Sequence, residues 1–201
     1  TMMRIRMKLS FALVFGSIFL QHAWALQDHQ DEVARYAEAG QKAMASGQYA
    51  EARENFEQLA KLEPNIAEIH ATLAVICFKQ REYERTIREI RTAQKLKPSL
   101  PRLDTLLGLA FAELDQFDEA LPLLEKGFHQ TADSEIRRMC GLQLLRAYPA
   151  LRRDSDAVET SLTLNKLFSD DPEVLYHTGR IYGIFAYKVM TKLKDTTPGS
   201  I

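Results

Sequence analysis

The feature that most constrains the fold of this chain is a residue pattern that recurs every 34 positions. Aromatic side chains stand at Tyr49, Tyr83 and Phe117, each 34 residues after the one before. Three other classes of side chain keep the same interval: Gly40, Ala74 and Gly108, then Ala52, Thr86 and Ala120, then Phe56, Ile90 and Leu124. A helical bundle without repeats would show 3.6-residue periodicity but no fixed long period. The pattern therefore predicts an array of repeats, each a small unit that packs on its neighbours.

This pattern resembles the tetratricopeptide repeat, in which two helices carry a large residue, a Leu-Gly pair, Tyr, Ala, Phe and a closing Pro. The first copy, residues 33–66, matches at Tyr36, Ala39, Gly40, Ala52, Phe56 and Pro64. The second, residues 67–100, matches at Leu73, Ala74, Cys77, Thr86, Ile90, Ala93 and Pro98. The third, residues 101–134, matches at Leu107, Gly108, Phe111, Ala120, Leu124 and Gly127. The resemblance implies an all-α fold, a right-handed α-solenoid of helix-turn-helix repeats over residues 31–195.

After residue 134 the spacing changes. A fourth copy over residues 135–171 has 16 residues between Gly141 and Ala157, where the earlier copies have 12. This copy therefore inserts about one helical turn, and Pro149 is expected to kink or end its first helix. Asp171-Pro172 is a helix-start signal that opens a partial copy over residues 172–195, followed by a tail over residues 196–201. The last helix is rich in apolar residues, so we expect either that it folds back onto the array or that the chain is a fragment of a longer protein.

The first 25 residues have a different character. Three basic residues precede a twelve-residue apolar run over residues 9–20, and Ala23 and Ala25 place small side chains before a possible cut. This arrangement predicts a secretory signal peptide over residues 1–25 that is cleaved after Ala25, with a retained anchor as the alternative. The run is shorter than the roughly 20 apolar residues that cross a bilayer. We therefore expect an exported protein, periplasmic or secreted, with a short segment over residues 26–30 and no membrane span after cleavage.

Composition and motifs exclude several classes of function. Lys and Arg number 26 against 27 Asp and Glu, and this balance argues against nucleic acid as a partner. The chain has no Gly-rich phosphate loop, no nucleophile elbow and no H-E-x-x-H motif. Cys77 and Cys140 form no zinc motif and fall two repeats apart, so we expect two buried free thiols. We predict no catalytic residues, no cofactor and no metal, and the sequence carries no signal for the oligomeric state.

Binding of a protein or peptide then remains as the function. In the family that this pattern resembles, side chains at defined positions of the first helices line a concave groove that runs across successive repeats. The candidate groove residues are Met44, Ala71, Val75, Phe78, Lys79, Arg102, Leu109 and Glu113. This lining is small and apolar with charges at its edges, which suits an amphipathic helix or an extended apolar segment, although it could also receive an internal helix or face solvent.

One specific function of such grooves is not transferred to this chain. Relatives that clamp a peptide carboxylate use Lys, Asn and Arg at these helix positions. This chain has Ala37, Ala71 and Thr105 at the fifth position and Gln41, Val75 and Leu109 at the ninth. We therefore interpret the chain as an exported protein-interaction scaffold. The alternative is the helical part of a longer exported enzyme, a protease or cell-wall enzyme, with its catalytic domain beyond residue 201.

Overall fold

A computed structural model describes residues 27–100 and 103–197. The predicted signal peptide, Arg102 and residues 198–201 lie outside the described residues. Within those two ranges the chain forms helices joined by short turns, with no strand. The predicted all-α fold of paired helices is confirmed.

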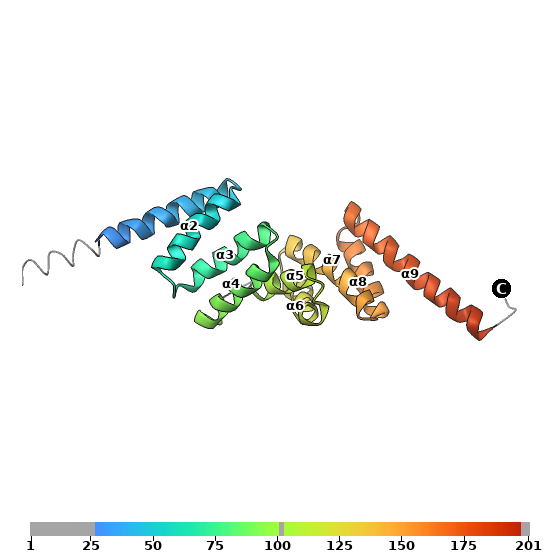
Figure 1. Cartoon of the computed structure of the whole chain (residues 1–201). Helices are drawn as coiled ribbons and strands as arrows, with labels where there is room; N and C mark the ends of the chain where they lie inside the picture. The colour runs from blue at the N-terminus through green and yellow to red at the C-terminus, as the bar shows by residue number, and fades with distance from the viewer. Residues whose placement is uncertain (1–26, 101–102, 198–201) are drawn as a thin grey trace, which may run out of the picture.

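The helices follow one another in hairpins, as Figure 1 shows from the blue to the red end of the chain. The first helix runs over residues 27–45. It is followed by α2 (Tyr49–Leu62), α3 (Ala67–Lys79), α4 (Tyr83–Leu96), α5 (Leu103–Glu113), α6 (Phe117–Gln130), α7 (Ser134–Ala150), α8 (Asp154–Leu167) and α9 (Pro172–Thr196). Helices α3 and α4, α5 and α6, and α7 and α8 pack as pairs, and each pair also contacts the next. The array therefore has successive first helices on one side and second helices on the other.

The small residues of the 34-residue pattern lie where the two helices of a hairpin meet. A Cβ placed on Gly108 would lie 2.8 Å from the Cβ of Leu123 on α6. On Gly40 it would lie 2.8 Å from the ring of Phe56, and on Gly141 2.7 Å from the side chain of Leu164. Only a residue without a side chain permits this approach, so the glycines set the distance between the helices of each pair.

The turn inside each hairpin also repeats. Gly47, Arg81, Asp115 and Arg152 have positive φ angles of 71°, 62°, 55° and 58°. The residue after each of them donates its backbone N–H to a carbonyl five residues earlier, as in the bond from Glu82 to Cys77 at 2.9 Å. This left-handed residue with its closing bond is a common way for a helix to end.

Two features expected from the sequence after residue 134 are present in the structure. Helix α7 has 17 residues against 13 in α3, so the inserted turn lengthens the first helix, and Pro149 lies in its last turn. Asp171 caps α9 by accepting hydrogen bonds from the backbone N–H groups of Glu173 and Val174 at 2.9 and 3.0 Å. The cap is braced by Arg138 of α7, whose Nε lies 2.6 Å from Oδ2 of Asp171.

Helix α9 does not fold back onto the array. Its first part packs on α7 and α8, but every residue from Tyr182 to Thr197 is exposed. Figure 1 shows its second half extending away from the other helices. Of the two expectations for this helix, burial by folding back is therefore wrong.

Candidate binding groove

A cavity of about 410 Å³ opens on the side of the array formed by the first helices. Its walls come from the helix over residues 27–45 and from α3, α5 and α7, and no second helix contributes to it. The lining residues are Met44, Ala71, Thr72, Val75, Phe78, Lys79, Leu103, Thr105, Leu106, Leu109, Ile136 and Met139. Nine of these twelve side chains are apolar, so the cavity offers a surface that water solvates poorly.

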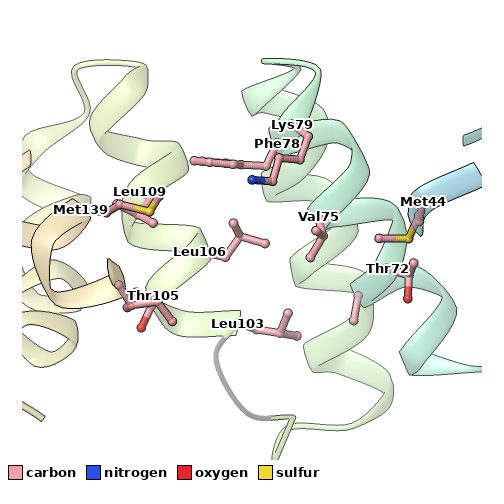
Figure 2. Close-up of a pocket in the computed structure, with 12 residues that line it drawn as sticks. Met44, Thr72, Val75, Phe78, Lys79, Leu103, Thr105, Leu106, Leu109 and Met139 are labelled. Carbon is pink, nitrogen blue, oxygen red and sulfur yellow. The ribbon is translucent and has the colours of Figure 1, made fainter. Parts of the chain in front are cut away.

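Each helix presents these residues because only one of its faces is used for packing. In α3, Leu73, Ala74, Ile76 and Cys77 are buried in the array. Ala71, Val75 and Phe78 lie on the adjacent face and are only half-buried. Figure 2 shows Val75 and Phe78 directed from α3 toward the space that Leu106 and Leu109 of α5 face from the other side. The floor of the groove is thus held in place by a core beneath it.

Six of the eight sequence-predicted groove residues line this cavity: Met44, Ala71, Val75, Phe78, Lys79 and Leu109. Arg102 lies outside the described residues. Glu113 does not line the cavity, and its carboxylate accepts a hydrogen bond from Nε2 of Gln143 at 2.7 Å and lies 3.9 Å from Nη1 of Arg146. Glu113 therefore links α5 to α7 and does not act as a free charge on the groove wall. That the other six residues bind a partner stays a prediction.

Other lining residues were not among the predicted set. Ile136 and Met139 hold the second and fifth positions of the fourth copy, which are the positions that define the groove in the earlier copies. Extending the same positional rule past residue 134 would have found both. Thr72 and Leu106 each follow the fifth position of their helix by one residue, so the positional rule does not include them. Both nevertheless line the wall of the cavity.

Phe78 and Lys79 differ from the rest of the lining. The Phe78 ring packs edge-on against Tyr83, with 5.5 Å between the ring centres and 66° between the planes. This contact fixes the ring at the end of the groove where α3 turns into α4. Lys79 is exposed, and its ammonium group pairs with no carboxylate among the residues of the two described ranges. Among the described residues that line the groove, Lys79 is the one charged side chain.

His70, Cys77 and Cys140 are held inside the array by hydrogen bonds or burial. His70 is bound at both ring nitrogens, with Nδ1 2.8 Å from Oε2 of Glu89 and Nε2 3.0 Å from the carbonyl oxygen of Pro64. Cys77 and Cys140 are buried free thiols, as expected. Burial raises the pKa of Cys77 to about 11 and that of Cys140 to about 12, so neither forms a nucleophilic thiolate at neutral pH. None of these groups faces the cavity.

The described part of the chain holds neither a candidate metal cluster nor a candidate membrane-spanning helix. Between residues 27 and 197, apart from 101 and 102, no group of three or more His, Cys, Asp or Glu side chains is arranged to hold a metal ion. In the same ranges no helix combines the length and apolar character that crossing a membrane requires.

Comparison with known proteins agrees with this architecture. Residues 43–110 match the family model described as tetratricopeptide repeat. The chain is 34% identical over 101 residues to the photosystem I assembly protein Ycf3 of Synechococcus sp. (strain CC9605). That match covers 49% of this chain and 56% of Ycf3, so the chain spans about half the length of this relative.

Solved structures show the same fold at lower sequence identity. A MamA structure designated MSR-1 has a TM-score of 0.64 and 20% identity, over 77% of this chain and 87% of that one. PilF of Pseudomonas aeruginosa has a TM-score of 0.59 and 20% identity, over 83% of this chain and 75% of that one. Residues 43–110 therefore match the tetratricopeptide repeat in sequence, and the chain shares the fold of these solved structures.

Proposed function

We propose that this protein is an exported tetratricopeptide-repeat scaffold whose groove holds an apolar helix or extended segment of another envelope protein. The observation that carries the proposal is the 410 Å³ cavity, which is formed by four first helices and lined mainly by apolar side chains. Ligand sites are concave, mostly apolar and usually preformed, and their volumes run from about 300 to 1,000 Å³. A cavity near the low end of this range fits a few side chains of a segment, and it does not fit a folded domain.

The lining favours an occupant that presents apolar side chains at helical spacing. A helix docks in such a groove through anchors at positions i, i+3 or i+4, and i+7. Phe78 is the expected centre of the binding energy, because aromatic side chains enclosed by neutral contacts dominate interface energetics. Lys79 stands at the mouth, where an exposed charge affects orientation and association rate more than affinity. We expect the occupant to place an acidic residue or a helix C-terminus near this ammonium group.

A matched pair of variants tests the groove. Phe78→Ala removes a large apolar side chain from the cavity, while Leu162→Ala removes one from the exposed surface of α8 outside it. A photoreactive amino acid at Val75 should capture a partner from an envelope extract, and a second one at the exposed Arg88 of α4 serves as the control position. We expect Phe78→Ala to abolish capture from position 75 and Leu162→Ala to preserve it. Equal capture by all three proteins, with unchanged helicity, would reject the groove as the binding site.

Export rests on residues 1–25 and has its own test. A chain expressed with its N-terminus intact should appear in the periplasm beginning at Leu26. Ala25→Arg should block this processing, because signal cleavage requires a small residue before the cut. A mature species that still carries Arg4 would refute cleavage without affecting the groove.

A further inference from the structure

Helix α9 carries, along most of its length, an apolar face that nothing in the described residues covers. Val174, Thr178 and Ile181 point into the array and are 0%, 5% and 3% exposed. Next to this buried face lies a second row at helical spacing, with Leu175, Gly179, Tyr182, Ala186, Val189 and Leu193, which we call the open stripe. Its four large side chains are 47%, 38%, 50% and 42% exposed in chain order. Monomeric proteins rarely expose a contiguous apolar row of this length.

The open stripe occupies the place where the other first helices meet their hairpin partner. Gly179 corresponds to Gly40, Gly108 and Gly141, on each of which a Cβ would lie less than 3 Å from a side chain of the second helix. A Cβ placed on Gly179 would meet nothing within 4 Å, and the same holds for Gly183. Helix α9 therefore has a residue suited to a close helix approach, but no helix between residues 27 and 197 makes that approach to it.

We propose that the open stripe packs against the same stripe of a second copy of this chain, with the two α9 helices antiparallel. Antiparallel packing repeats the relation between the two helices of each hairpin, so α9 of one copy takes the place of a second helix for the other. A two-fold interface of this kind requires one surface to be complementary to itself.

The stripe meets this requirement in a single alignment. When Leu175 is level with Leu193 of the second copy, Gly179 is level with Val189 and Tyr182 is level with Ala186. Each small residue then faces a large one, and the ends close with leucine against leucine. In a parallel pair, Tyr182 would face Tyr182, which overpacks the interface, and Gly179 would face Gly179, which leaves a gap.

Charge also favours the antiparallel arrangement. The N-terminal end of α9 carries Asp170, Asp171 and Glu173, of which the last two are partly neutralised by Arg138. The other end carries Lys192 and Lys194 together with Asp195. Antiparallel pairing brings the acidic end of one helix to the basic end of the other, and it also aligns the helix dipoles favourably.

The size of the stripe sets the strength of the dimer. From Leu175 to Leu193 the helix rises roughly 27 Å at about 1.5 Å per residue. One helix face of this length buries well under the roughly 800 Å² per partner of a standard interface. We therefore expect a dimer that dissociates on dilution, with half-association at tens of micromolar as an order-of-magnitude estimate.

Sedimentation equilibrium of the 201-residue chain and its variants tests the proposal. Leu175→Glu and Leu193→Lys each place a charge against a leucine, and we expect each to weaken association about tenfold or more. Mixed in equal amounts, the two variants should form a heterodimer in which one Glu–Lys pair and one Leu–Leu pair face each other. Both substitutions suit their helix ends, since acids stabilise the N-terminal turn and bases the C-terminal turn.

Leu162→Glu on α8 is the control, because Leu162 is 57% exposed and lies outside the stripe. All variants contain the same residues 1–26, so association through that segment would be equal in all of them and would not produce a difference between variants. A wild-type chain that stays monomeric at about 200 µM would overturn the proposal, since a Kd of tens of micromolar predicts mostly dimer there. Failure of the mixture to associate, or equal weakening by Leu162→Glu, would also overturn the proposal.

Discussion

Replacing two equivalent glycines by alanine should change stability in opposite directions. Gly108 and Gly179 hold the same position in their repeats, and both lie inside a helix. In an exposed helix, alanine is about 0.8–1.0 kcal/mol more favourable than glycine. At Gly179 nothing opposes this gain, because a Cβ there has no neighbour within 4 Å. Gly179→Ala should therefore stabilise α9 by about 0.5–1 kcal/mol.

At Gly108 the same methyl group meets α6. It would lie 2.8 Å from the Cβ of Leu123 and 3.3 Å from the backbone nitrogen of Leu124. Neither atom can move by a change of rotamer, so α5 and α6 must separate. Overpacking of this kind costs about 1–3 kcal/mol, which exceeds the gain in helix propensity. Gly108→Ala should thus destabilise by about 1–2 kcal/mol and lower the Tm by roughly 2–8 °C.

Urea unfolding followed by circular dichroism at 222 nm measures the change at Gly108, with an unchanged m-value as the check for an unaltered transition. Helical arrays can open from their ends, so the change at Gly179 is read from amide hydrogen exchange of α9. Both measurements belong at low concentration, where α9 is unpaired. If Gly108→Ala proves as stable as the parent, α5 and α6 do not approach as closely as the structure shows.

Three further predictions concern separate parts of the array. The hydrogen bond from Arg138 is the main cause that lowers the pKa of Asp171 from 3.8 to about 2. The ionised Asp171 carboxylate should therefore stabilise the fold fully above pH 4, and this stabilisation should be lost as the pH falls toward 2. Asp171→Asn keeps the helix cap but not the titrating carboxylate. Its free energy of unfolding in urea should therefore depend less on pH over this range than that of the parent. Cys77 and Cys140 should resist iodoacetamide at pH 8 until urea unfolds the chain, because burial raises both pKa values. Arg81→Gly should raise the free energy of unfolding by about 0.5–1 kcal/mol by relieving a positive φ, as measured by the same urea titration.

The overall architecture could be predicted because it depends on packing constraints that recur in sequence. A glycine or alanine is needed wherever two helices nearly touch, and the requirement returns with every repeat. The turns between helices are less visible. Gly47 has the residue type expected at positive φ, but Arg81, Asp115 and Arg152 adopt the same conformation without it. Asp tolerates this conformation better than most residues, but at the two arginines the hairpin imposes the backbone and residue type gives no signal.

The groove was predicted only as far as single-helix positions determine it. Position within a helix indicates the face on which a side chain lies. This was enough to predict that Val75 and Leu109 line the same cavity. It does not indicate what the neighbouring helix offers. Glu113 has the expected position, but α7 presents Gln143 and Arg146 to its carboxylate. The carboxylate of Glu113 pairs with these side chains of α7, so it is not available to a ligand in the groove.

The two sides of the array divide the tasks of stability and recognition. Second helices are joined by charged pairs, such as Arg85 of α4 to Glu57 of α2 at 2.6 Å, while first helices expose apolar side chains next to a fully buried row that includes Ile76. The spacing of the repeats is thus fixed by contacts that lie outside the groove. A partner that enters the groove finds its walls already ordered, so little of its binding energy is needed to arrange them. Phe78 also packs against the buried cluster that includes Leu109, so a loss of binding in Phe78→Ala is assigned to the groove only where the helicity of the variant is unchanged.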